Sequence, residues 1–533
     1  MIKFKKGLLT AMVAVAATSL SSCLFKKNAK ADDESRTNVI FWSCFGSKYT
    51  EILKPIVSDI SKAKSIEIDH KTQGSYPGIL SAVMNAMATG DYPDIAIGYP
   101  DHFVQYLGSD ILRPLDKYVG ESLNDYDPNY IPENEFYDED GEKHLYGVPF
   151  NKSTELLGYN GVFVDYVAEQ HGASYATIPE TWDEWYSEDP ASKVQVYLTE
   201  FESLISNKAL VYAEVDAQHR ASHFEVFDKD HYPATAPAGK TLVLNYKDGD
   251  HSKHRLFTWD STDNAFITLV RQWGAEYTKV PESEYQEAID DRQGHVLFAN
   301  STHKSTTVSM LKFFRNLAER GVFGVPSNVG GTGANFASEA FATGNVMFMV
   351  CSSGGLSYNT ENKALRFSLE PIPYKTANKK FVISQGANIC MTDHGSAERS
   401  WEVMKALTTG EFQTRWAMET GYFPASSTAE QSQEYQAFLN STDTSNYTVS
   451  VYRQGSQVNS HVYGKASEGW TRFVDDAFVG SAIVRELVGN IIPNVLANIK
   501  TADINTDSKY EDELATILND TRIARNANIV VEK

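Results

Sequence analysis

Asp101 is the residue of this chain whose type and position best suit the binding of a small polar molecule. Ile95-Ala96-Ile97 is a short apolar run between turn residues, as expected of a strand that is buried on both faces. Gly98, Tyr99 and Asp101 follow at its carboxyl end, where open α/β sheets place their ligand-binding loops. These residues combine a carboxylate, an aromatic ring and a flexible backbone. The alternative is that Asp101 only caps the following helix.

Other groups of residues that could do chemistry lack the required spacing. Five histidines crowd residues 219–254 and acidic residues surround Gly141, but neither group has the spacing of a zinc or calcium site. The chain has no nucleophile elbow, HExxH motif or phosphate-binding loop. We therefore expect no metal, no cofactor and no enzymatic activity. The remaining enzymatic alternative is a glycosidase that uses Asp101 and Asp260 as its two carboxylates.

The predicted strand before Asp101 belongs to an alternation of strands and helices. Apolar residues in 79–87 recur at helical spacing, and Gly90 and Pro93 end that helix. Earlier strands are predicted at 38–42 and 66–69. The helix between them contains Pro55 and should begin late or kink there. This alternation predicts a parallel sheet of the α/β class.

The first residues have the features of an export signal. Three lysines precede an apolar stretch that is too short to span a bilayer. Leu20-Ser21-Ser22-Cys23 resembles the lipobox of bacterial lipoproteins, which implies cleavage before Cys23 and acylation of its thiol. We divide this end into a lipoprotein signal peptide (1–22) and a lipidated cysteine with a flexible tether (23–37). The alternative is an ordinary signal peptide with a chance cysteine.

Charge and cysteine content limit the partners of the chain. Loss of residues 1–22 removes three lysines and no acidic residue, so the net charge falls from −21 to −24. Nucleic acid and anionic headgroups would repel so acidic a chain, which instead suits neutral or cationic small molecules. If Cys23 carries lipid, three of the four cysteines remain. A disulfide framework is therefore not expected.

The later part of the chain has fewer clear patterns. Asp248-Gly249 between two apolar runs predicts a hairpin. A strand at 346–350 leads into a loop of small residues, and Pro371-Ile372-Pro373 has the composition of an interdomain crossing. Residues 464–525 are predicted to be largely helical, with a break or kink at Pro493.

Several segments occur in an order that resembles a known family. They are PDIAIGYPDHF (93–103), ILRPLDKY (111–118), YGVPF (146–150), PETWDEW (179–185), FATGNVMFMVCSSG (341–354), PIP (371–373) and SWEVMKALTTGEFQTRWAMETGYFP (400–424). With the lipobox, they resemble the family 1 extracellular solute-binding proteins of bacterial ABC importers, the maltose-binding-protein-like group. The resemblance implies a two-lobed periplasmic-binding-protein-like fold of type II, in which the ligand cleft lies between discontinuous lobes joined by hinge crossings.

The same resemblance implies how the chain is divided and which residues bind ligand. The N-terminal lobe would be 38–150 plus 371–415 and the C-terminal lobe 151–370 plus 416–533, with 190–320 as an insertion. The candidate ligand-binding residues are Ser43, Phe45, Tyr76, Tyr99, Asp101, Asn151, Trp259, Asp260, Ser352, Ser353 and Tyr422. Gly98 stands where some members have a stacking tryptophan, and His102 stands where some have an arginine.

These residue types suit a carbohydrate, because aromatic rings cover its C–H faces while carboxylate, amide and hydroxyl groups bond its hydroxyls. The resemblance implies a monomer that closes around a sugar and docks on the transmembrane permease subunits of an ABC importer. It would be lipid-anchored in the bacterial cell envelope, outside the cytoplasm. The alternatives are a surface adhesive or interaction lipoprotein on the same fold, and a binding protein for glycerol phosphate or ferric iron.

Overall fold

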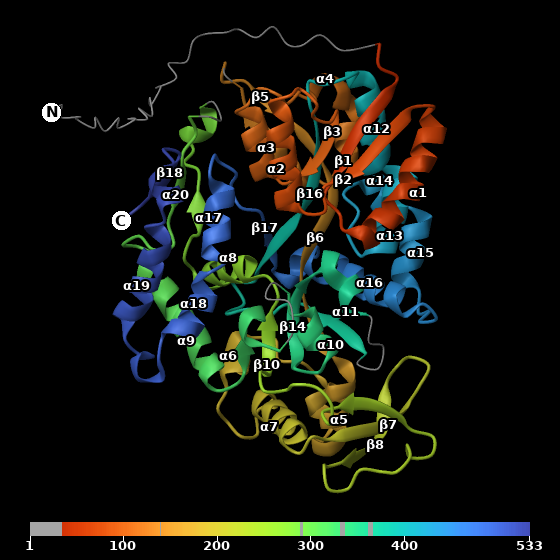
Figure 1. Ribbon diagram of the computed structural model, residues 1–533, viewed down its shortest axis with the longest axis vertical. Helices are drawn as coiled ribbons and strands as arrows, with labels where there is room; N and C mark the ends of the chain where they lie inside the picture. Colours follow the sequence, from red (N-terminus) through yellow and green to blue (C-terminus); the bar gives the residue numbers. More distant parts are fainter. Residues whose placement is uncertain (1–34, 139, 288–290, 331–335, 361–365) are drawn as a thin grey trace, which may run out of the picture.

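Three parallel strands begin the fold, as predicted from the sequence. The computed structural model describes residues 35–138, 140–287, 291–330, 336–360 and 366–533 (Figure 1). β1 (Asn38–Ser43) pairs in parallel with β2 (Glu67–Thr72) and β3 (Ile95–Gly98), and α1 (Ser47–Lys64) and α2 (Tyr76–Met87) connect them. α1 does not begin late, because it starts at Ser47 and continues through Pro55, which lies on its exposed face.

Two long antiparallel strands extend this sheet into the other half of the molecule. β6 (Gly147–Asn160) and β16 (Phe381–Met391) pair with each other, and β16 also pairs with β3 and with β17 (Thr471–Phe473). The far end of β6 pairs with β14 (Val346–Ser352) and β15 (Phe367–Glu370). The order is β13-β10-β14-β6-β16-β3-β1-β2, where β10 is Arg255–Trp259 and β13 is Phe323–Gly324. Figure 1 shows β6 running from the upper to the lower half.

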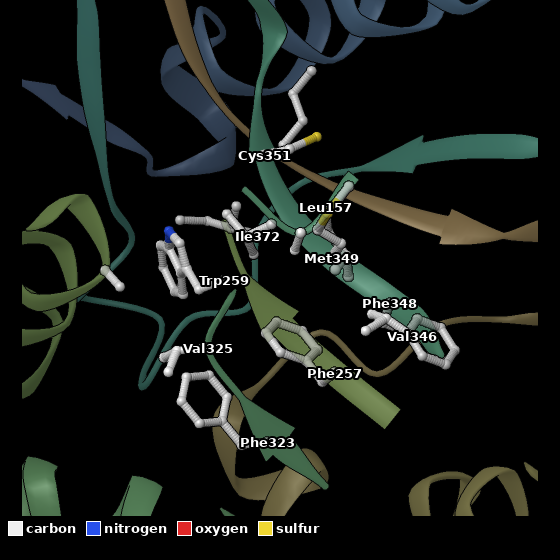
Figure 2. Close-up of a cluster of buried hydrophobic side chains, with 14 of the residues drawn as sticks. Leu157, Phe257, Trp259, Phe323, Val325, Val346, Phe348, Met349, Cys351 and Ile372 are labelled. Atoms are coloured by element: carbon white, nitrogen blue, oxygen red, sulfur yellow. The ribbon is translucent and has the colours of Figure 1, made fainter. Parts of the chain in front are cut away.

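The buried apolar side chains form two clusters, which are the cores of two lobes. The first takes residues from 39–150 and 387–416, together with Tyr422. The second takes residues from 156–383 and 417–529. Figure 2 shows part of the second core, where Phe257, Trp259 and Phe348 lie among aliphatic side chains. Each lobe is therefore assembled from segments that are far apart in the sequence.

The change from one core to the other falls within β6 and β16. Along β6 the first core ends at Phe150 and the second begins at Leu156, while along β16 the second ends at Ile383 and the first resumes at Ala387. Pro371-Ile372-Pro373, which was predicted as the crossing, lies in the second lobe, because Ile372 is buried in the second core. We therefore propose that the chain crosses between lobes inside β16 and not before it.

Much of the segment predicted as an insertion is integral to the second lobe. α8 (Thr262–Trp273), α9 (Lys304–Glu319) and β10 all carry residues of the second core. Among the described residues of 190–320, only β7 (Leu210–Val215), β8 (Ala221–Phe227) and β9 (Thr241–Asn245) form a sheet of their own, at the lower edge of Figure 1. The hairpin predicted at Asp248-Gly249 is not formed, because β9 pairs with β7 while β10 joins the main sheet.

The C-terminal region is mostly helical, as predicted. α17 (Ser481–Val488) ends before α18 (Ile491–Asn498) begins, so the break precedes Pro493. Pro493 lies in the first turn of α18, where a proline removes no intrahelical hydrogen bond. α19 (Asp507–Leu518) and α20 (Thr521–Ala524) follow. β18 (Ile529–Val531) then pairs with β12 (Gly294–Val296), which pairs with β11 (Thr278–Lys279).

The fold also contains further helices and two short strands that pair with each other. They are α3 (Pro100–Leu107), α4 (Asp116–Val119), β4 (Glu135–Tyr137), β5 (Lys143–Leu145), α5 (Gly161–His171), α6 (Trp182–Tyr186), α7 (Lys193–Ser206), α10 (Ser338–Ala342), α11 (Leu356–Asn359), α12 (Ala397–Thr408), α13 (Gly410–Thr420), α14 (Ser427–Glu430), α15 (Gln433–Asn440) and α16 (Tyr447–Val458). Within the ranges that the structure describes, none of the helices has the length and apolar character needed to cross a membrane.

Candidate functional site

A cavity of about 220 Å³ lies between the two lobes. The first lobe contributes the start of α3, the second lobe contributes parts of α8, β11 and α17, and β16 contributes residues from the crossing. Its polar and aromatic lining includes Tyr99, Asp101, Glu133, Ser261, Asp263, Asn264, Tyr277, Thr278, Ser384, Gln385, Asp475, Asp476 and Arg485. Because both lobes form its walls, any movement of one lobe relative to the other changes its shape.

Asp101 lies in the wall of this cavity, in the first turn of α3. The start of α3 has no side-chain cap, so Asp101 does not act as the helix cap that was the alternative prediction. Its Oδ1 atom is buried and has no hydrogen-bond partner in the part of the chain that the structure describes. Nε2 of His102 is 3.9 Å from this oxygen. Burial lowers the pKa of that imidazole, so His102 is neutral at pH 7.

A guanidinium from the second lobe lies across the cavity from Asp101. Arg485 donates from Nε to Asp263 Oδ2 (2.9 Å), from Nη1 to Asp475 Oδ2 (3.0 Å) and from Nη2 to Asn264 Oδ1. Burial alone would lower the pKa of Arg485, but the two carboxylates raise it above its usual value. Five carboxylates and this one guanidinium are the charged groups among the described lining residues, so the wall is acidic.

Two further lining residues hold polar atoms without partners. Tyr277 Oη and Thr278 Oγ1 are buried and make no hydrogen bond within the described ranges. Tyr277 is only 2% exposed and Thr278 only 6%. Because an unpaired buried polar group costs about 1–3 kcal/mol, we expect water or a bound molecule to satisfy both atoms.

Five of the predicted residues gather in an aromatic cluster beside the cavity. The Tyr76 ring stacks on Tyr99, with centroids 4.1 Å apart, and Tyr99 lines the cavity. Phe45 and Tyr422 lie with ring centroids 6.3 Å apart. Burial raises the pKa of Tyr76, Tyr99 and Tyr422, so their hydroxyls stay protonated. Asn151 is buried near these hydroxyls, and neither of its amide atoms makes a well-formed hydrogen bond in the described structure.

The three predicted serines lie outside the cavity lining. Ser43 is buried at the end of β1, with its Oγ 2.9 Å from Nε2 of His70. Ser352 Oγ accepts a backbone N–H of its own turn (3.1 Å), and Ser353 Oγ accepts the N–H of Thr154 (3.4 Å). Each serine is therefore bonded within the protein.

Trp259 and Asp260 also lie outside the cavity lining. Trp259 is fully buried in the second core, and its Nε1 donates to Glu155 Oε1 (2.6 Å). Asp260 Oδ1 accepts the N–H of Ala337 (2.5 Å), and burial raises the pKa of Asp260 to about 6. Because only Asp101 lines the cavity, the structure does not bring this pair to one site as a glycosidase would require.

A second cavity, of about 690 Å³, adjoins the first. Pro100, Glu133, Ser384 and residues 474–477 line both cavities, so the two are parts of one cleft. The aromatic side chains of its wall are Tyr130, Phe136, Tyr137, Tyr285, Tyr463 and Trp470. The cleft therefore offers room and ring surface beyond the first cavity.

Several lining residues were not predicted from the sequence. Tyr277, Thr278, Asp475 and Arg485 come from the second lobe, where the pattern indicated only amphipathic helices or no clear element. The available signal was weak: Arg485 directly follows the apolar run Ala482-Ile483-Val484 of α17. No comparable signal marks Tyr277 or Thr278.

No group of three or more His, Cys, Asp or Glu side chains that could hold a metal ion occurs among the residues described. The cysteines in those ranges, Cys44, Cys351 and Cys390, are free and buried. The predicted signal peptide, Cys23 and most of the tether lie outside the described residues.

Known proteins share the sequence pattern and the fold of this chain. The family model of the bacterial extracellular solute-binding protein matches residues 56–440. No curated protein matches the chain in sequence.

Solved structures match nearly the whole chain. The GacH receptor of Streptomyces glaucescens GLA.O, solved unliganded and with acarbose, is 13% identical with a TM-score of 0.60, covering 91% of this chain and 98% of its own. UgpB from Mycobacterium tuberculosis, in complex with glycerophosphocholine, is 16% identical with a TM-score of 0.61, covering 91% of this chain and 99% of its own. A putative oligosaccharide periplasmic-binding protein from Synechococcus sp. MITs9220 is 13% identical with a TM-score of 0.61, covering 92% of this chain and 100% of its own. At these identities the likeness shows the fold alone, which is the predicted two-lobed type II fold.

Proposed function

Because this chain belongs to the bacterial extracellular solute-binding protein family, whose members serve ABC importers, we propose that it captures a carbohydrate between its lobes. It then delivers this solute to the transmembrane permease subunits. Members of the family bind solutes outside the cytoplasm and do not convert them.

The unsatisfied polar atoms of the interlobe cavity are the observation that supports this proposal most directly. Asp101 Oδ1 comes from the first lobe, and Tyr277 Oη and Thr278 Oγ1 come from the second. Sugar hydroxyls both donate and accept, so neighbouring hydroxyls of one molecule can bond all three. The half-buried ring of Tyr99 offers surface for a C–H face of a sugar.

Hinge movement at β6 and β16 would couple binding to delivery. A ligand that touches both lobes favours the closed form, because only there are both sets of contacts made. Direct contacts between the lobes favour it too: Tyr49 Oη in α1 donates to Gly354 O (2.5 Å), and Lys48 Nζ donates to Ser357 O (2.8 Å). The permease would then recognise the closed form.

A phosphate-containing solute is the main alternative, since UgpB was solved with glycerophosphocholine. Phosphate needs a cation with free donors. Arg485 already donates to Asp263 and Asp475, and no other guanidinium or ammonium occurs among the described lining residues of the first cavity. An oxyanion there would also meet the carboxylate of Asp101, whose Oδ1 has no hydrogen-bond partner among the described residues. A carbohydrate fits this wall better. The GacH receptor, which shares the fold, was solved in complex with acarbose.

We further propose that lipid on Cys23 holds the protein at the outer face of a membrane as a monomer. The composition before and after Cys23 supports this, because a short apolar stretch precedes it and a polar, aperiodic segment follows it. Mass spectrometry of the protein isolated from membranes tests the anchor. An unmodified Cys23 thiol or a retained N-terminus would contradict it.

A thermal-unfolding screen of the purified protein against mono-, di- and oligosaccharides tests the proposed function. A ligand at 100 times its Kd stabilises the folded state by about 2.7 kcal/mol. We expect one sugar class to raise the Tm, Asp101→Ala to remove that shift, and Asp91→Ala, at an exposed position, to keep it. The same sugar should reduce the radius of gyration in small-angle scattering. A shift with glycerol phosphate alone would overturn the carbohydrate, and no shift with any solute would favour the adhesive alternative.

A further inference from the structure

Most carboxylates around the first cavity have a cation beside them. Asp263 and Asp475 share the guanidinium of Arg485 at 2.9 and 3.0 Å. Asp475 also lies 3.4 Å from Nη2 of Arg271. These two carboxylates and two guanidiniums form a neutral group within the second lobe.

Two carboxylates at the boundary with the second cavity also have a cation nearby. Glu133 is paired with the buried ammonium of Lys152. Asp476 accepts a backbone N–H at 2.9 Å. Arg292 Nη2 donates to the carbonyl of Ala477, the residue after Asp476 (3.0 Å), and Arg292 and Asp476 line the same wall of the second cavity, so this guanidinium lies near the carboxylate.

Asp101 is the remaining carboxylate of the wall, and it has no such partner in the described structure. Its Oδ1 is buried and makes no hydrogen bond. His102 is near it but neutral, because that imidazole is buried. Arg485 interacts with it across the cavity, but its donors already serve the second lobe. The wall therefore carries about one uncompensated negative charge, and it is located on Asp101.

We propose that the solute carries a single positively charged nitrogen, which lies against Asp101 in the closed cleft. This rests on the proposed function and specifies its substrate class: an amino sugar or a similar hydroxylated amine. The hydroxyls of such a solute bond Tyr277 and Thr278, while its nitrogen supplies the missing charge.

A neutral sugar satisfies the hydrogen bonds of this wall but not its charge. Closure removes water from Asp101, and a desolvated carboxylate is costly unless a cation accompanies it. A hydroxyl donates one hydrogen bond and leaves the charge in place. An ammonium does both, and the half-buried ring of Tyr99 lines the same cavity and can face a cation.

Isothermal titration calorimetry with matched sugars tests this inference. The probes are hexosamines of the gluco, galacto and manno series, each compared at pH 6.5 with the hexose and the N-acetylhexosamine that differ only at C2. Choline serves as a cation that is not a sugar. We expect one hexosamine to bind at least tenfold more tightly than its neutral counterparts. Asp101→Asn should remove that preference, whereas Asp91→Asn, at an exposed position, should retain it.

The outcomes separate this inference from the proposed function. A neutral sugar that binds as tightly as its amine, or an Asp101→Asn variant that keeps the preference, overturns the cationic nitrogen and leaves carbohydrate capture intact. If choline binds and no sugar does, the cationic nitrogen of the solute is supported and carbohydrate capture is overturned. No binding by any member of the panel refutes both.

Discussion

Glu155 should make the stability of this protein depend on pH near neutrality. This residue lies in β6 and is 1% exposed. Burial raises the pKa of its carboxyl from 4.5 to about 8, although Trp259 Nε1 and Thr268 Oγ1 donate to its two oxygens at 2.6 and 3.3 Å. Glu155 therefore takes up a proton on folding at neutral pH.

The sign and size of the effect follow from this shift. Because the folded pKa is above the unfolded one, Glu155 contributes stability below pH 4.5 that is lost as the pH rises through 8. One pKa unit corresponds to about 1.36 kcal/mol. Between pH 5 and pH 8 the contribution of Glu155 to the free energy of unfolding should therefore fall by about 3–4 kcal/mol.

Urea unfolding between pH 5 and pH 9 measures this contribution. Glu155→Gln keeps an acceptor for Trp259 but cannot titrate, so it should match the wild type most closely at pH 5 and exceed it by about 3 kcal/mol at pH 8. Glu121→Gln, at an exposed position, controls for a general loss of charge. Parallel pH curves for the wild type and Glu155→Gln would refute the reasoning.

Three further substitutions test the hinge and the contacts between lobes. Lys152→Met leaves the Glu133 carboxylate buried without its cation and should lower the free energy of unfolding in urea by about 3–5 kcal/mol. Adding Glu133→Gln should restore part of this loss, whereas an unchanged midpoint for Lys152→Met would argue against the ion pair. Gly386→Ala should lower the free energy of unfolding by about 3 kcal/mol or more, because φ is +115° there and a Cβ would overlap a carbonyl oxygen of β6. A Tm equal to that of the wild type would contradict this expectation. Tyr49→Phe removes the hydrogen bond to the carbonyl of Gly354 and should enlarge the radius of gyration without ligand, measured by scattering; an identical radius would show that this bond does not hold the lobes.

Local pattern predicted the first lobe well, because its elements carry strong periodicity. β1, β3 and α2 begin and end near the predicted residues, since apolar runs, helical spacing and end signals such as Pro93 act over a few neighbours. The late start of α1 predicted from Pro55 was wrong, because the helix already begins at Ser47 and Pro55 lies on its exposed face. β10 was misread because a strand buried on both faces has no alternation to indicate its partner, and Asp248-Gly249 has the composition of a hairpin turn.

The site was predictable only where it follows the strand ends of the first lobe. Tyr99 and Asp101 follow β3 directly, so the rule for open α/β sheets located them. Trp259 has the residue type of a sugar-stacking ring, but its neighbours in the second core bury it. Arg485 reaches the cavity through contacts between α17, α8 and α3, which no local pattern encodes.

The sheet that continues through both lobes also constrains the order in which the protein can fold. β3 takes its second neighbour from β16, and 294 residues separate the paired Ala96 and Cys390. Until β16 has been synthesised, β3 is an unprotected edge, and α12 and α13 are missing from the first core. Such distant pairing makes folding slow. A chain that stops before residue 391 therefore loses the centre of its first lobe as well as the end of its second.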